Sequence, residues 1–135
     1  MWVEVLVNHT KIAIGTLYKA PNIPCTTFHD VYDSLVYILS KYDDPILTGD
    51  FNVNMLNPES SDYKHLSDSL IEPFDLKQII NKPTRITDKS KTLIDLLFVK
   101  DLNKVKTFGL CDASGVSDHF LYIWHIILKS QSLSQ

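Results

Sequence analysis

The sequence predicts one mixed domain of the α/β or α+β class. Its 135 residues suit a single domain with one modest core. Short apolar stretches with strand-like patterns outnumber helical ones, and the two kinds are mixed along the chain. No internal repeat or linker divides the sequence. We therefore expect a folded domain over residues 1–129, followed by a flexible tail over residues 130–135.

The first half of the chain is predicted to form a hairpin, a helix and a buried strand. Residues 2–7 alternate in polarity as a strand does, and residues 12–18 form its partner after a short turn. Residues 27–41 place apolar side chains at helical spacing, with Thr27 as the expected N-cap. Residues 45–48 form a short apolar strand that leads into Gly49 and Asp50.

The second half is predicted to contain a weaker helix and several strands. The helix covers residues 61–71 and is expected to end before Pro73. A short strand follows at residues 76–80, and residues 82–90 are expected to form a polar loop. The remaining strands are predicted at 93–99, 105–111 and 120–128, of which the last is apolar enough to be buried on both faces.

Composition excludes some functions and leaves others open. The formal net charge of −3 argues against a protein that binds nucleic acid tightly through its overall charge. No apolar stretch is long enough to cross a membrane. The two cysteines are far apart and are expected to be reduced thiols in an intracellular protein. The segment 77–91 contains five basic residues and one acidic residue. Such a cluster is more commonly a solvated surface, and the alternative is a rim that contacts phosphate.

Polar residues stand at the ends of several predicted strands or interrupt them. Tyr18 and Asp50 end strands, Asp95 interrupts one, and Asp118 and His119 precede the last. Because strand ends meet at one edge of a sheet, we expect these side chains to converge there. Carboxylates in one pocket would repel each other unless a cation held them, and oxygen ligands suit Mg²⁺ or Mn²⁺.

Each of these residues also has an ordinary structural interpretation. Asp50 could belong to a simple Gly-Asp turn, and Asp95 could accept hydrogen bonds from neighbouring backbone N–H groups. Tyr18 could cover the core. If the chain stays extended after Asp50, the Asp50 and Asn52 side chains point to one side while Phe51 packs on the other.

Four blocks in this order resemble the signatures of the endonuclease/exonuclease/phosphatase superfamily: GTLYKAP at 15–21, LTGDFN at 47–52, TLIDLLF at 92–98 and SDH at 117–119. The block IINKPTR at 79–85 is similar to one in the apurinic-type endonuclease domain of non-LTR retrotransposons. A phosphatase within the superfamily is a less favoured interpretation for that reason.

The resemblance implies a set of catalytic roles. Asp50 would orient or deprotonate the attacking water, and Asn52 would hydrogen-bond the phosphate. Asp95 would pair with His119, which would contact the scissile phosphate. Asp118 would help to position the metal or the water.

Further residues would bind the substrate. Tyr18 would donate a hydrogen bond to a phosphate oxygen. Thr84 would contact the DNA backbone, with Arg85 nearby.

The resemblance also implies a four-layer αββα sandwich built from two similar halves. The blocks of the first half, including an early Asn and a metal-binding Glu, have no counterpart in this chain. We therefore expect a partial sandwich that lacks its N-terminal half and leaves a sheet face exposed for association.

The expected function is that of a divalent-metal-dependent phosphodiesterase, a DNA endonuclease domain from a non-LTR retrotransposon, where a reverse transcriptase commonly follows. It would act on the DNA phosphate backbone with Mg²⁺ or Mn²⁺ as its cofactor. No membrane partner is expected, and the expected location is inside the cell, with the nucleus as a candidate compartment. The alternative is a non-catalytic, truncated remnant of that domain.

Overall fold

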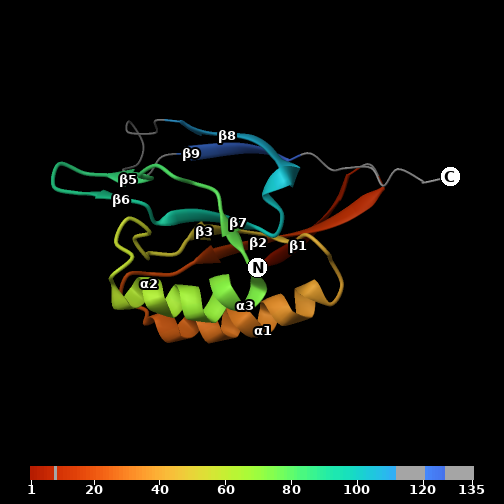
Figure 1. The fold of residues 1–135 in the computed structure, drawn as a ribbon, viewed down its shortest axis with the longest axis horizontal. Helices are drawn as coiled ribbons and strands as arrows, with labels where there is room; N and C mark the ends of the chain where they lie inside the picture. The colour runs from red at the N-terminus through yellow and green to blue at the C-terminus, as the bar shows by residue number, and fades with distance from the viewer. Residues whose placement is uncertain (8, 112–120, 127–135) are drawn as a thin grey trace.

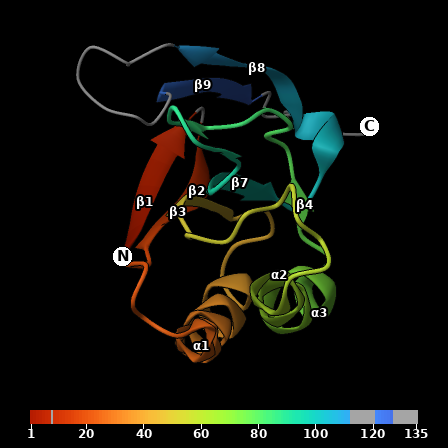
Figure 2. The ribbon, with the colours of Figure 1, turned by 90° about the vertical axis from the view of Figure 1, so that its left-hand side faces the viewer.

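The computed structural model describes residues 1–7, 9–111 and 121–126 of the chain. A five-stranded sheet forms the middle layer, with helices on one face and a two-stranded hairpin on the other (Figures 1 and 2). This mixed α/β arrangement is the class that the sequence predicts.

The central sheet combines parallel and antiparallel pairs. Its strand order is β1-β2-β3-β7-β4, and only β2 and β3 run parallel. The predicted N-terminal hairpin is confirmed, and Asp95 begins its strand instead of interrupting it. The strands are β1 (Trp2–Val7), β2 (Thr10–Tyr18), β3 (Ile46–Asp50), β7 (Asp95–Val99) and β4 (Lys77–Gln78).

The first predicted helix is present as α1 (Phe28–Leu39). A short 3-10 helix, η1 (Cys25–Thr27), runs directly into it. Thr27 occupies the N-cap position as predicted, but it is already helical, with φ −60° and ψ −20°, and its side chain makes no capping hydrogen bond. The capping mechanism expected for Thr27 is therefore wrong, because η1 already supplies helical backbone before α1.

The second helical region continues past its predicted end. It comprises α2 (Ser61–Leu66), the π-helical turn η2 (Ser67–Ile71) and α3 (Glu72–Phe74). Ser60 caps it, since its hydroxyl oxygen accepts a 3.1 Å hydrogen bond from the Tyr63 N–H. Pro73 lies in α3, directly after the π-helical turn η2, so the helical region ends at Phe74 and not before the proline.

The region predicted as a polar loop contains a small antiparallel hairpin. Its strands are β5 (Arg85–Ile86) and β6 (Lys91–Thr92), and its turn is closed by a 2.9 Å bond from Thr87 N–H to Ser90 O. The loop prediction is wrong here because two-residue strands are too short to show an alternating pattern.

A last hairpin covers part of the sheet face opposite the helices. After the short helix η3 (Leu102–Lys104), β8 (Val105–Cys111) pairs antiparallel with β9 (Leu121–Ile126), and Figure 2 shows this pair above β7. The prediction that the last strand is buried on both faces concerns side chains outside those that the structure describes.

The core lies between the sheet and the helices. Phe51 connects its two sides, with ring centroids 6.0 Å from Phe28 of α1 and 5.4 Å from Phe98 of β7. All three rings are fully buried, so each contributes a large apolar area. The buried leucines Leu35, Leu66, Leu70 and Leu96 complete this layer.

The N-terminal strand presents two different faces. The Trp2 indole N–H donates a 2.6 Å hydrogen bond to the Ser34 hydroxyl of α1, which places Trp2 on the helical face. Because side chains alternate along a strand, Val3, Val5 and Val7 lie on the opposite face. Val3 is 48% exposed and Val7 38% exposed. Among the described residues, no helix is long and apolar enough to cross a membrane.

Candidate active site

Strand register places three of the predicted site residues in one row. Tyr18 at the end of β2 pairs with Asp50 at the end of β3, and Asp50 pairs with Asp95 at the start of β7. Phe98 faces the helices, and alternation along β7 therefore places Asp95 on the other face. Three residues distant in sequence thus share one end of the sheet.

Gly49 makes the close approach of β2 and β3 feasible at this end. Its φ is +140°, and a Cβ added there would lie 1.9 Å from the Leu17 carbonyl oxygen. Only glycine accepts this backbone without strain. The residue before Asp50 is therefore fixed by geometry, independently of any chemical role.

The chain turns sharply after Asp50 instead of staying extended. Asn52 has φ +48°, in the left-handed region that asparagine tolerates better than most residues. Its backbone N–H donates to Asp50 Oδ1 at 3.0 Å, and its side-chain Nδ2 donates to the Lys19 carbonyl oxygen at 2.6 Å. The segment therefore does not adopt the extended conformation that was the condition for Asp50 and Asn52 to point to one side, and Phe51 is fully buried.

Lys19 is a buried residue that the sequence analysis did not single out. It is only 4% exposed, and its ammonium group donates to the carbonyl oxygens of Ile23 at 2.9 Å and Ala20 at 3.4 Å. Its backbone N–H also donates to the Asp50 carbonyl oxygen at 2.9 Å. A lysine after a strand, in a loop with two prolines, gives no sequence signal of burial, because lysine is almost always exposed.

A second group of hydrogen bonds connects the segment around Asn52 to the residues directly before β7. The Phe51 N–H donates to the Ile94 carbonyl oxygen and the Met55 N–H to the Leu93 carbonyl oxygen, both at 2.9 Å. Asn54 Oδ1 in turn accepts from the Leu93 N–H at 3.0 Å. Asn54 is another supporting residue that sequence reasoning missed, and the Asn-x-Asn spacing with Asn52 is the signal that could have found it.

Thr84 and Arg85 lie at the base of the β5–β6 hairpin. Thr84 is fully buried, and its hydroxyl oxygen accepts hydrogen bonds from the backbone N–H groups of Ile94 at 3.2 Å and Asp95 at 3.0 Å. Arg85 begins β5 and pairs with Thr92. The hairpin extends from the end of the sheet where β3 ends and β7 begins (Figure 1).

Asp118 and His119 lie outside the described residues, and their roles stay predictions. Within the described residues, no group of three or more His, Cys, Asp or Glu side chains could hold a metal ion. Asp50 and Asp95 are a register pair of oxygen donors, the ligand type that hard divalent cations prefer. This pair fits such an ion in chemistry, but a complete ligand set would need residues beyond those described.

The fold and this row of strand-end residues define a domain of the endonuclease/exonuclease/phosphatase type. A sequence profile described as endonuclease-reverse transcriptase matches residues 12–123, which is most of the chain. The chain belongs to this endonuclease-reverse transcriptase family.

Solved structures share the fold at low sequence identity. The endonuclease domain of TRAS1, a telomere-specific non-LTR retrotransposon, superposes with a TM-score of 0.77 at 16% identity, over 96% of this chain and 64% of that one. An endonuclease/exonuclease/phosphatase family protein from Leptotrichia buccalis gives 0.67 at 19% identity, over 94% and 52%. One from Bacteroides vulgatus gives 0.63 at 15% identity, over 95% and 54%.

The chain therefore spans about half to two thirds of the length of these structures. A search of the curated proteins found no match.

Proposed function

We propose that the chain forms part of a divalent-metal-dependent DNA endonuclease domain of the non-LTR retrotransposon type. The row of Tyr18, Asp50 and Asp95 across three neighbouring strands is the observation that carries this proposal. Its support is chemical, because phosphodiester hydrolysis needs an activated water and groups that stabilise charge on the phosphate. The family match over residues 12–123 adds to that support.

Asp50 is the proposed group that orients or deprotonates the attacking water. The bond from the Asn52 N–H to Asp50 Oδ1 holds the carboxylate in one orientation. A general base must lie within hydrogen-bond reach of the proton that it removes, so a fixed carboxylate is an advantage. The strand pairing with Asp95 places a second carboxylate beside it.

Asn52 is the proposed donor to a phosphate oxygen. An amide group carries two N–H donors, and one of them bonds to the Lys19 carbonyl oxygen. That bond fixes the plane of the amide, and we assign the second N–H to the phosphate. A donor oriented before the substrate arrives stabilises developing charge without reorganisation.

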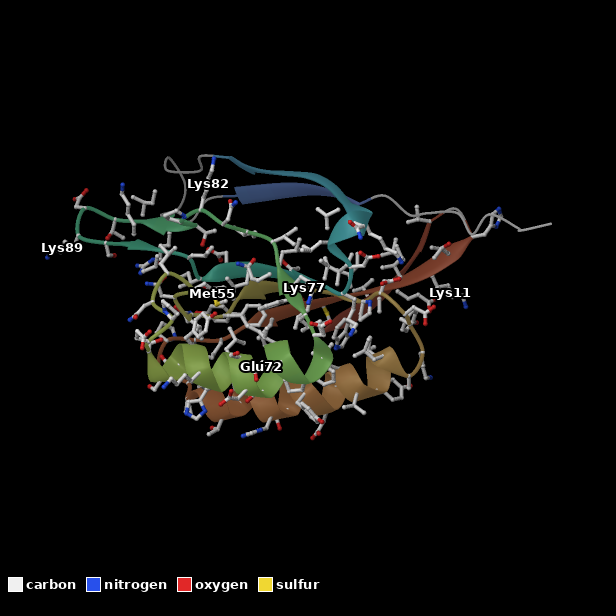
Figure 3. The ribbon with its side chains drawn as sticks, in the orientation of Figure 1. Lys11, Met55, Glu72, Lys77, Lys82 and Lys89 are labelled. Carbon is white, nitrogen blue, oxygen red and sulfur yellow. The ribbon has the colours of Figure 1, made fainter. Side chains whose placement is uncertain are left out.

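Tyr18 and Arg85 are the proposed contacts to the substrate. The Tyr18 side chain is 70% exposed beside Asp50, so its hydroxyl is accessible to a phosphate group. Arg85 at the hairpin base would contact the DNA backbone through its planar guanidinium. Figure 3 shows Lys89 at the outer end of the same hairpin.

His119, Asp118 and Asp95 complete the proposal by family resemblance. His119 would contact the scissile phosphate while Asp95 fixes its ring. Asp118 is a candidate ligand for Mg²⁺ or Mn²⁺, an ion that would supply Lewis-acid stabilisation of the phosphate. An enzyme of this kind would act on DNA in the nucleus.

Nicking of supercoiled plasmid in the presence of Mg²⁺ tests the proposal. We expect the wild-type chain to convert supercoiled DNA to the open circular form, and the Asp118→Ala variant to lose this activity. Equal conversion by the two proteins would show that the nicking does not depend on Asp118 and would contradict the proposal. Plasmid binding without nicking by the wild type would support the alternative of a non-catalytic remnant.

A further inference from the structure

We propose that Thr84 is a positioning residue that holds Asp95 in place, and that it links Asp95 to the β5–β6 hairpin. The inference rests on the proposed function, because it assigns a role within that site. Thr84 is one of two polar side chains among the buried residues that the structure describes, and it is fully buried. A buried hydroxyl requires a hydrogen-bonding explanation.

The hydroxyl oxygen of Thr84 accepts two hydrogen bonds from consecutive residues. The Asp95 N–H donates at 3.0 Å and the Ile94 N–H at 3.2 Å. Ile94 precedes β7, and Asp95 is its first residue, so these two donors lie where the regular pairing with β3 begins. Thr84 therefore fixes the backbone from which the Asp95 side chain projects.

Thr84 also closes the base of the hairpin. Its own N–H donates to the Thr92 carbonyl oxygen at 2.9 Å, and Arg85 and Thr92 pair directly after it. One residue thus connects the hairpin, with its basic side chains, to the first residue of β7. Any displacement of the hairpin base changes the position of the two hydrogen bonds that Asp95 and Ile94 make.

A positioning role differs from a direct contact with DNA in what its loss changes. Loss of a DNA contact weakens substrate binding and raises KM, whereas a misplaced catalytic group lowers kcat. The Thr84 side chain has no exposed surface, so it acts through Asp95. Its loss should therefore lower kcat and leave KM little changed. A small displacement of a catalytic group is enough to slow a reaction strongly.

Thr84→Val is the variant that separates these roles, since valine has the shape of threonine without the hydroxyl. We expect kcat for cleavage of a labelled DNA duplex with Mg²⁺ to fall by about 10- to 100-fold with KM little changed. Thr84→Ser keeps the acceptor and should restore most of kcat. A rise in KM at unchanged kcat, or a Thr84→Ser variant as impaired as Thr84→Val, would overturn the proposal.

Thr92→Val is the matched control within the same hairpin base. The Thr92 hydroxyl is buried and has no hydrogen-bond partner among the residues that the structure describes, so its removal leaves none of their donors or acceptors unsatisfied. We expect wild-type kcat and KM from this variant. A loss of kcat equal to that of Thr84→Val would show that any change at the hairpin base is harmful, and would overturn the specific role of Thr84.

Amide hydrogen exchange gives a readout that does not depend on activity. In the wild type, the Ile94 and Asp95 N–H groups should be protected, and Thr84→Val should accelerate their exchange by about five- to tenfold relative to other β7 amides. If the wild type cuts no DNA but shows this selective change, the proposed function fails and the positioning bonds stand. Unprotected Ile94 and Asp95 amides in the wild type would overturn the inference even if Thr84→Val does not fold.

Discussion

Two residues with positive φ flank the Asp50 carboxylate, and they define the site at the scale of single residues. Gly49 allows β3 to approach β2, and Asn52 turns the chain back so that its N–H meets Asp50. Neither conformation suits an ordinary side chain. The sequence Gly-Asp-Phe-Asn is therefore constrained by backbone geometry as well as by chemistry.

Gly49→Ala should destabilise the fold strongly. The added Cβ would meet the Leu17 carbonyl oxygen, a backbone atom that cannot rotate away, and its φ of +140° would be strained. We expect a loss of about 2–4 kcal/mol in the free energy of unfolding, measured by urea denaturation.

Gly15→Ala is the comparison for this prediction. Its added Cβ would meet the Trp2 ring at 2.8 Å, and a side chain in the edge strand can shift where backbone cannot. We expect a smaller loss than for Gly49→Ala. Equal losses would show that strain at Gly49 is not the dominant cost.

Cys25 should make the free energy of unfolding decrease with rising pH in the alkaline range. Burial raises the pKa of its thiol above the usual value, and a hydrogen bond with Asp62 adds to the shift. The unfolded thiol, with a pKa of about 8.5, loses its proton first as pH rises. The stabilising contribution is therefore fully present below that pKa and is lost as pH rises through the folded pKa.

Urea denaturation at pH 7 and pH 10 measures this contribution. We expect the wild type to lose more stability between these pH values than Cys25→Ala, in which the titrating group is gone. A pH dependence that is identical in the two proteins would contradict the raised pKa.

At the scale of elements, the β5–β6 hairpin is the feature expected to determine how DNA binds. Lys89 lies at its outer end, and Lys11 lies at the opposite end of the molecule (Figure 3). If the hairpin contacts phosphate, Lys89→Ala should weaken DNA binding and reduce the slope of log K against log salt by about 1. Fluorescence anisotropy over a salt series measures that slope.

Lys11→Ala is the matched control, because it removes the same charge from an exposed lysine far from the hairpin. We expect its salt slope to equal that of the wild type. Equal effects of the two substitutions would mean that overall charge, and not the hairpin, governs binding.

The same hairpin shows why some elements could not be predicted from the sequence. The long strands and α1 could be predicted because their apolar residues repeat with a clear period over enough residues. β5 and β6 have two residues each, and their pairing depends on tertiary contacts such as the bond between Thr84 N–H and Thr92 O.

The site was partly predictable for a similar reason. Asp50 and Asp95 stand beside apolar strands, where a carboxylate is unexpected and therefore informative. Lys19 supports the site through its backbone hydrogen bond to Asp50, and Thr84 through a hydroxyl that accepts from the Ile94 and Asp95 N–H groups. These bonds join segments distant in sequence, so neither the burial of Lys19 nor the partners of Thr84 follow from a local pattern.

At the scale of the whole molecule, the exposed valines of β1 form an apolar surface on the face opposite α1. Val3 and Val7 are exposed there, and Val5 between them is half-buried. Contiguous apolar surface of this kind favours association. We expect the chain to self-associate as its concentration rises. In sedimentation velocity, the double variant Val3→Thr and Val7→Thr should stay monomeric up to a higher concentration than the wild type.

Val36→Thr provides the control, because Val36 is 49% exposed on α1, on the other side of the sheet. It should associate as the wild type does. A wild type that remains monomeric at all concentrations, or an equal effect of Val36→Thr, would contradict a role for the β1 surface.

The row of strand-end residues around Asp50 is the proposed site of DNA cleavage, and the nicking rate of Asp50→Asn tests this role most directly. This variant keeps the size of the side chain and an acceptor for the Asn52 N–H but removes the carboxylate. Asp43→Asn is its control, since Asp43 is exposed and lies before β3, at the opposite end of the sheet.

With Mg²⁺ and supercoiled plasmid, we expect Asp50→Asn to nick at least about 100-fold more slowly than the wild type, and Asp43→Asn to match it. Nicking by Asp50→Asn at the wild-type rate would contradict a catalytic role for Asp50.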